Sequence, residues 1–336
     1  MKIALITPAR ARSRNGNRHT AMRWAAMLRA LGHKVRVSVS WDGQPADVML
    51  ALHARRSHAS IVQFRERFPA SPLVVVLTGT DLYRDIHRDR DAQASLALAD
   101  RLVVLQEMGR IELPARFRRK TRVIYQSAEV HASRKAPTRR FRVAVVGHLR
   151  EEKDPFRAAL ALAHLRDLPE IEVVQLGEAL SPEMAREARR LMRADPRYRW
   201  LGNVPHWAAL RRLSRSHVLV VSSRMEGGAN VICEAAAAGV PVIASRISGN
   251  VGMLGRGYPG YYPIENERAL ARQIRRAAHD PRYYARLKRL VAARRVLFRP
   301  TAEQEGLRSL LAELEPRALR QPPRSRSSRT GPKLRR

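Results

Sequence analysis

The sequence predicts an α/β fold of two doubly wound parallel-sheet domains that face a central cleft. Short apolar runs alternate with helical patterns, glycine turns follow several of these runs, and 336 residues suffice for about two domains. Apolar runs between helices are typical of parallel strands that are buried on both faces. Ligands bind at the carboxyl ends of such strands, so two facing domains enclose one cleft.

The first domain is expected over residues 1–135. Its predicted strands are short and apolar: Lys2–Thr7, Lys34–Ser40, Val48–Leu52, Leu73–Leu77, Arg101–Leu105 and Arg122–Ile124. A helix is predicted over Thr20–Leu31, and Gly32 is expected to end it as a left-handed cap. The polar stretch 132–140 contains Pro137 and is expected to link the two domains.

The second domain is expected over residues 141–300. Its predicted strands are Phe141–Val146, Ile171–Leu176, Tyr198–Leu201, Val218–Val221 and Val240–Ala244. Its predicted helices are Pro155–Arg166, Pro182–Ala194, Trp207–Arg215, Asn230–Ala238 and Glu267–Ala278. Another helical pattern covers residues 301–315. The tail 316–336 is rich in Arg, Pro and Ser with little to bury, so we expect it to be disordered.

The chain is strongly basic, which bears on its partners. Lys and Arg number 64 against 30 Asp and Glu, giving a net charge of +34. Such a balance would normally indicate nucleic acid or an anionic surface. The charges are scattered, however, and aromatic residues make up only 5%, too few for base-stacking platforms. We therefore expect no nucleic-acid partner and attribute most of the excess to compositional drift.

Cysteine content and hydropathy exclude other classes of protein. A single cysteine, Cys233, excludes an internal disulfide and a multi-cysteine metal site. No apolar stretch approaches the roughly 20 residues of a membrane span, and the strand-like start leaves no room for a signal peptide. We expect a cytoplasmic protein with no stable membrane insertion, no bound metal and no cofactor. Nothing in the sequence indicates the oligomeric state.

Two carboxylates flank a glycine turn at the start of a predicted helix. Glu226 follows the strand Val218–Val221, and Glu234 lies eight residues later on roughly the same face. Glu226 can accept hydrogen bonds from sugar hydroxyls, and Glu234 can accept them from ribose hydroxyls. Gly227 and Gly228 let the backbone approach a ligand, and the free N–H groups at the helix start favour a phosphate.

Two cations follow the first predicted strand of the second domain. Phe141–Val146 ends in a turn at Gly147, and Arg150 and Lys153 come three residues apart after it. A guanidinium can bind phosphate through two parallel hydrogen bonds, whereas an ammonium adds a compact charge. Together with the two carboxylates, these cations indicate a nucleotide-sugar site.

This pair of motifs resembles the donor half of the retaining glycosyltransferases with the GT-B fold, which has two Rossmann-like domains. The family signature of Glu, seven residues, Glu, an alanine-rich helix and Gly-x-Pro-Val-Ile-Ala-Ser matches residues 226–245. The resemblance implies that Arg150 and Lys153 bind the diphosphate, Glu226 the transferred sugar and Glu234 the ribose. It makes Glu226, Arg150 and Lys153 the catalytic set, and residues 301–315 a helix that crosses back to the first domain.

The same resemblance implies further donor contacts. These come from Gly147, Val204, Pro205, Gly227, Gly228, Ala229 and Asn230. The turn at 228–230 would hold the sugar and the β-phosphate, and the loop at 201–206 would border the nucleotide base. No Asp-x-Asp pair stands beside these motifs, so the two cations are expected to take the place of a metal ion.

The acceptor is expected to bind the first domain. The loop after the first strand holds four arginines, at positions 10, 12, 14 and 18, and leads into a helix start, which indicates an anion site. Its residues nearest the cleft are Asn15, Gly16, Asn17 and Arg18. Other acceptor-side candidates follow later strands, namely His53, Thr80 and Asp81. A packed or capping role for these three is the open alternative.

The segments at 7–20 and 78–86, with Leu50–Ser57, Met225–Ala229 and Ser248–Leu254, closely resemble the selenosugar synthases of selenoneine biosynthesis. The likeness covers about residues 1–315. It implies a hexosyltransferase that joins the sugar of a UDP-sugar, such as UDP-N-acetylglucosamine or UDP-glucose, to the selenium of selenophosphate. Because selenophosphate arrives ionised, no dedicated general base is needed. Many GT-B relatives carry a histidine where Thr78 stands here.

Two other functions stay open. One is a GT-B transferase acting on a lipid or polysaccharide acceptor, with the basic first domain resting on an anionic membrane. It requires an amphipathic basic helix with exposed aromatic residues, and Trp24 in the predicted helix Thr20–Leu31 is the feature that favours it. The other is a nucleic-acid-binding protein, which the net charge alone supports.

Overall fold

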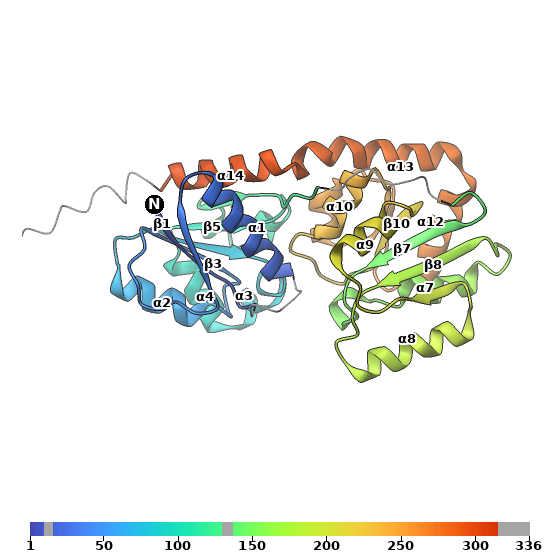
Figure 1. The fold of residues 1–336 in the computed structure, drawn as a ribbon, viewed down its shortest axis with the longest axis horizontal. Helices are drawn as coiled ribbons and strands as arrows, with labels where there is room; N and C mark the ends of the chain where they lie inside the picture. The colour runs from blue at the N-terminus through green and yellow to red at the C-terminus, as the bar shows by residue number, and fades with distance from the viewer. Residues whose placement is uncertain (10–15, 130–136, 315–336) are drawn as a thin grey trace, which may run out of the picture.

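The computed structural model describes residues 1–9, 16–129 and 137–314. It contains two six-stranded parallel sheets with helices on their faces (Figure 1). The predicted α/β fold with two doubly wound domains is confirmed. The site candidate Asn15, the arginines at positions 10, 12 and 14, most of the expected linker and the expected disordered tail lie outside the described residues.

The first sheet has the strand order β2-β1-β3-β4-β5-β6, and every neighbouring pair is parallel. Its strands are β1 (Lys2–Ile6), β2 (Lys34–Ser38), β3 (Val48–Leu52), β4 (Leu73–Leu77), β5 (Arg101–Val104) and β6 (Thr121–Val123). The strand order reverses between β1 and β3. A crevice for ligands is expected at the carboxyl ends of strands that flank such a reversal.

Helices connect these strands in sequence. They are α1 (Gly16–Ala30), α2 (His58–Arg67), α3 (Ile86–Arg88), α4 (Arg90–Leu98), α5 (Gly109–Glu112) and α6 (Ala115–Arg118), with a π-helical segment, Asp81–Asp85, before α3. Helix α1 begins one turn earlier than predicted. Gly32 follows it with φ +87°, the left-handed conformation expected of a glycine cap.

The second sheet repeats the arrangement in the order β12-β11-β10-β7-β8-β9, again with parallel pairs only. Its strands are β7 (Phe141–Val146), β8 (Ile171–Leu176), β9 (Tyr198–Trp200), β10 (Val218–Val221), β11 (Val242–Ser245) and β12 (Tyr261–Tyr262). Here the order reverses between β7 and β10, the strands that precede the predicted cations and carboxylates. The short edge strand β12 was not predicted.

The helices of the second half depart from prediction in three places. They are α7 (Arg157–Ala161), α8 (Pro182–Ala194), α9 (His206–Leu213), α10 (Asn230–Ala238), α11 (Ser248–Leu254), α12 (Glu267–His279) and α13 (Pro281–Arg294). A single helix over Pro155–Arg166 was wrong, because α7 ends at Ala161 and a tighter 3₁₀ turn, Leu162–His164, follows it. Helices α11 and α13 were not predicted.

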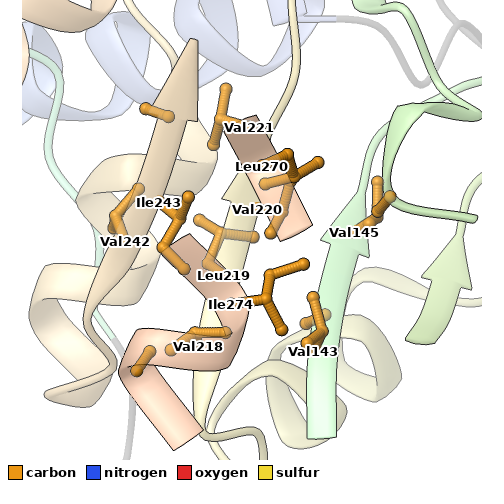
Figure 2. Packing of buried hydrophobic residues seen from close by; sticks show 14 of the residues in the cluster. Val143, Val145, Val218, Leu219, Val220, Val221, Val242, Ile243, Leu270 and Ile274 are labelled. Carbon is orange, nitrogen blue, oxygen red and sulfur yellow. The ribbon is translucent and has the colours of Figure 1, made fainter. Parts of the chain in front are cut away.

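A buried layer of branched side chains holds β7 and β10 side by side. Val143, Val220 and Ile243 from three neighbouring strands pack with Leu270 and Ile274 of α12, and each is at most 1% exposed (Figure 2). Branched residues suit a pleated surface that is covered on both faces. This packing fixes the positions from which the loops after β7 and β10 leave the sheet.

The last described helix, α14 (Pro300–Ala312), lies against the first sheet, whereas α13 lies beside the second (Figure 1). Leu307, Leu310 and Leu311 join a buried cluster with Trp24 of α1 and Leu5 of β1. The chain therefore starts and ends its described part in the same domain.

Candidate active site

A cavity of about 690 Å³ lies between the carboxyl ends of the two sheets. Its walls come from α1 and the loops after β3, β4 and β5 on one side, and from the loops after β7, β8, β9 and β10 on the other. Both reversals of strand order face it. Its volume is in the range of small-molecule sites.

Lys153 and Glu226 form an ion pair in this cavity, across the ends of β7 and β10. The Ser223 hydroxyl donates a second hydrogen bond of 2.6 Å to the same Glu226 oxygen, Oε1. The side chains of Lys153 and Glu226 are 24% and 8% exposed. Between described residues Glu226 Oε2 makes no hydrogen bond, so this oxygen can accept one from a ligand.

The turn after β7 is fixed from the neighbouring strand. At the end of β10 the Ser222 hydroxyl donates to the carbonyl oxygens of Asp154 and Lys153, at 2.7 and 3.1 Å. Asp154 adopts a left-handed conformation with φ +43°, which lets the chain turn back into α7. Arg150 precedes this turn and lines the cavity, with its Nε 4.0 Å from Glu152 Oε2. This loose contact leaves the guanidinium able to bind an anion.

The glycine pair at 227–228 meets the first domain as well as the cavity. A Cβ on Gly227 would lie 2.3 Å from the Thr78 carbonyl oxygen, and one on Gly228 would lie 2.6 Å from Leu105 Cβ. Gly79 completes this contact with its own Cβ position 3.7 Å from Gly227 N. The sequence interpretation explained these glycines by close approach to a ligand, but the structure adds contact between the two domains.

Glu234 is held by the last residue of the loop 201–206, a histidine that was expected to border the base and not to contact Glu234. Its Oε1 accepts a hydrogen bond of 2.9 Å from Nε2 of His206, at the start of α9, and this bond raises the pKa of His206. The ring of His19, on α1, lies 5.6 Å from the His206 ring. The pKa of His19 is lowered, first by burial and then by His206. All three residues line the cavity, so the histidines meet between the domains.

The remaining donor candidates also line the cavity. These are Gly147, Val204, Pro205, Ala229 and Asn230. Asn230 opens α10, and its Oδ1 is buried without a hydrogen-bond partner in the described part of the chain. Such an unpartnered acceptor is typical of a place that a ligand completes.

The acceptor-side candidates divide into two groups. Gly16, Asn17, His53 and Thr80 line the cavity, whereas Arg18 and Asp81 are not among the described residues of its wall. Asp81 is fully buried and accepts backbone N–H groups of Ala54, Thr78 and Gly79 at 3.0, 3.0 and 2.8 Å. It therefore fixes the turns after β3 and β4 and supports the site from behind.

Two basic residues of the cavity wall escaped sequence analysis. Arg23 comes one helical turn after His19, but its guanidinium donates two hydrogen bonds to Glu303, at 2.8 and 3.1 Å. Arg56 lies three residues after His53, in the turn that follows β3. The rule that ligands bind at the carboxyl ends of strands was the signal that could have singled out Arg56.

The described residues provide neither a metal cluster nor a membrane-spanning helix. In residues 1–9, 16–129 and 137–314, no group of three or more His, Cys, Asp or Glu side chains is placed to hold a metal ion. The helices within those ranges include none with the length and apolar character to cross a bilayer. Cys233 is fully buried in α10, and burial raises the pKa of its thiol, as expected for a packed residue.

The sequence matches the family Glycosyl transferases group 1 over residues 126–293, half of the chain. The chain belongs to this family. It is therefore a glycosyltransferase, and the matched span of this group 1 enzyme includes Lys153, Glu226 and Glu234. The first-domain wall of the cavity that contains His53 and Thr80 lies outside the matched span.

Solved structures with the same fold span nearly the whole group 1 enzyme. One is HepE of Anabaena in complex with UDP and glucose, with a TM-score of 0.74 and 16% identity over 94% of this chain and 100% of that chain. Another is sucrose-phosphate synthase from Thermosynechococcus elongatus, with a TM-score of 0.76 and 18% identity over 94% of this chain and 99% of that chain. A third is a glycosyltransferase from Rickettsia africae ESF-5, with a TM-score of 0.72 and 13% identity over 96% of this chain and 99% of that chain. These likenesses confirm the GT-B fold.

Proposed function

We propose that this glycosyltransferase transfers the sugar of a UDP-sugar to selenophosphate and forms a carbon–selenium bond. The observation that carries the proposal is the Lys153–Glu226 ion pair beside Arg150, at the reversal of strand order in the second sheet. The identity of the acceptor is inferred from the sequence resemblance to the selenosugar synthases. We expect UDP-N-acetylglucosamine or UDP-glucose as the donor.

The donor is assigned to the second domain. Arg150 and Lys153 would bind the diphosphate, together with the N–H groups that open α10. Glu226 would hold the sugar and Glu234 the ribose, while Val204 and Pro205 border the base. Structures of HepE, which has the same fold, hold UDP with glucose and UDP-glucose.

The transfer step needs little proton chemistry. The bond between the anomeric carbon and the β-phosphate oxygen breaks, and its electron pair leaves with UDP. The ionised selenium of selenophosphate attacks that carbon and forms the new bond. Charge grows on the leaving diphosphate, where Arg150 and Lys153 stabilise it. No metal is assigned to this step.

The membrane alternative loses the residue that supported it. Trp24 is 0% exposed and donates a hydrogen bond of 2.7 Å to Glu303, so its ring is unavailable for a bilayer surface. Membership of a glycosyltransferase family argues against the nucleic-acid alternative, which the net charge alone supported.

One assay tests the proposal. Purified protein is incubated with UDP-N-acetylglucosamine or UDP-glucose and with selenophosphate, thiophosphate or a plain sugar, and the products are weighed by mass spectrometry. We expect a selenium-linked sugar phosphate and, more slowly, its sulfur analogue. A product formed only with the plain sugar would overturn the assignment of the acceptor.

A further inference from the structure

We infer that Arg56 binds the anionic acceptor, with the Thr80 hydroxyl as a second contact. The inference deepens the proposed function and rests on it for the identity of the anion. Arg56 is exposed, lines the cavity and follows β3, whereas the sequence assigned the anion to the first loop and to Arg18.

The position of Arg56 in the fold favours a ligand contact. It lies in the turn between β3 and α2, at the carboxyl end of one of the two strands that flank the order reversal in the first sheet. Arg150 follows β7, which flanks the matching reversal in the second sheet. Ligands of doubly wound sheets bind at these two places. The cavity wall thus includes one arginine from a strand-end loop at each reversal.

A strained and well-supported turn presents Arg56. His53 has φ +74°, a left-handed conformation that is costly for a residue other than glycine. Asp81 accepts the N–H of Ala54, and the Ser57 hydroxyl donates to the carbonyl oxygen of Leu52 at 2.6 Å. The chain therefore holds this turn in one unusual shape, as functional turns are often held.

Hydrogen bonds in this turn also direct the Thr80 hydroxyl. The Arg56 N–H donates to Nδ1 of His53 at 3.3 Å, so in neutral His53 the proton sits on Nε2. Nε2 lies 3.1 Å from Thr80 Oγ1 and 3.9 Å from Asp85 Oδ2, so in this tautomer the closer partner of its N–H is the Thr80 hydroxyl oxygen. The hydroxyl proton of Thr80 is then left for a ligand in the cavity. His53, at 2% exposure, acts as a positioning residue for both neighbours.

The charges on the cavity wall single out Arg56 on the acceptor side. Arg23 is paired with Glu303, and Lys153 is paired with Glu226. Among the residues that the structure describes, no carboxylate lies within ion-pair distance of the Arg56 guanidinium. The adjacent Arg55 instead pairs with Asp89 at 2.9 Å and does not line the described cavity.

These features suit a small tetrahedral anion of the phosphate type. A guanidinium offers two parallel N–H groups to two phosphoryl oxygens, and the Thr80 hydroxyl can donate to the third. The remaining atom, selenium in selenophosphate, is then free to face the anomeric carbon of the donor. Charge repulsion between the acceptor and the UDP diphosphate is reduced, because each anion has a guanidinium of its own.

The variants Arg56→Ala, Arg56→Lys and Thr80→Val test the inference, with Arg55→Ala as the matched control. Acceptor KM is measured with selenophosphate, and binding of thiophosphate and of UDP is measured by calorimetry. For Arg56→Ala we expect the acceptor KM and the thiophosphate Kd to rise about 10- to 100-fold, with UDP affinity unchanged. The acceptor KM and thiophosphate Kd of Arg56→Lys should lie between those of Arg56→Ala and of the wild type. In Thr80→Val both constants should rise less than in Arg56→Ala, and in Arg55→Ala they should equal the wild-type values.

Three results would count against one claim or the other. An unchanged acceptor KM and thiophosphate Kd in Arg56→Ala, in a protein with wild-type Tm, would overturn the role of Arg56 and leave the proposed function standing. If Arg56→Ala lost as much affinity for UDP as for thiophosphate, the role of Arg56 would also be overturned, because its side chain would then affect donor and acceptor binding alike. A wild type that binds thiophosphate through Arg56 but transfers no sugar to selenophosphate would overturn the proposed function and retain the anion site.

Discussion

The indole Nε1 of Trp24 donates a hydrogen bond of 2.7 Å to Glu303 Oε1 and so joins α1 to α14. The same carboxylate accepts two bonds from Arg23, and its Oε2 accepts the N–H of Ser127 at 2.8 Å. Glu303 is 1% exposed. Arg23 and Ser127 both line the cavity, so one buried carboxylate fixes part of its wall.

Replacing this carboxylate should weaken the first domain. Glu303→Ala leaves the Arg23 guanidinium and the Trp24 N–H without their partner, which costs about 3–5 kcal/mol of unfolding free energy for a buried pair. Urea unfolding measures the loss. Glu313→Ala is the control, because Glu313 is 31% exposed, pairs with Arg101 and Arg122, and should cost below about 1 kcal/mol. Equal losses would show that Glu303 contributes no more than a surface residue.

Lys153→Ala should remove activity without unfolding the protein. The side chain is partly exposed, and Glu226 keeps its bond to Ser223, so Tm should change little. Because Lys153 is proposed to stabilise the leaving diphosphate, its loss should lower kcat about 10²- to 10³-fold. UDP release from a UDP-sugar measures this. Arg224→Ala, whose exposed side chain pairs with Glu265, should keep wild-type kcat. Full activity in Lys153→Ala would refute the donor assignment.

Gly227→Ala should force the two domains apart. Its Cβ would lie 2.3 Å from the Thr78 carbonyl oxygen, a backbone atom that cannot move aside alone. We expect a wider cleft by small-angle scattering and a fall in kcat of at least about tenfold, because reacting groups lose their alignment. Gly257→Ala is the matched control, with no atom within 4 Å of the added Cβ. Normal kcat in both variants would show that the contact is not needed for transfer.

The His206–Glu234 pair should make stability depend on pH. Glu234 raises the pKa of His206 above its usual 6.5, so the pair stabilises the fold fully below that value. The contribution is lost as pH rises through the raised pKa. The stability of wild type relative to His206→Ala should therefore decrease between about pH 6 and pH 9. The NMR titration of His206 in Glu234→Gln should move toward 6.5, and an unmoved titration would rule out the pairing in solution.

Much of the fold could be predicted because its signals are local. The strands β3 and β4 were predicted with their observed bounds, since five apolar residues in a row fit a strand buried on both faces. Helix α8 was also predicted correctly, with Ser181 capping its first turn. Helix α10 also has its predicted bounds, and Gly239 caps its end with φ +71°. Conversely, β12 has only two residues, too few for a periodic pattern.

The site was only partly predictable, because several of its contacts join distant parts of the chain. Glu226 and Lys153 were recognised from strand ends that the fold brings together. The contact of Gly227 with Thr78 links two domains, and no spacing along the sequence reveals it. His206 and Arg56 belong to loops whose shape depends on neighbouring strands. Asp81 follows β4 and was predicted to contact the acceptor. In the structure its carboxylate is buried and accepts backbone N–H groups instead.

The return of α14 to the first sheet governs the order of events during synthesis on the ribosome. The first sheet emerges early, but Leu307, Leu310 and Leu311, which cover part of it, are among the last described residues to be translated. Until then the buried cluster that contains Leu5 and Trp24 lacks the three leucines that complete it. An N-terminal fragment that stops before α14 should therefore expose apolar surface and aggregate more readily than the full chain. We expect the nascent chain to depend on chaperones until α14 has been translated.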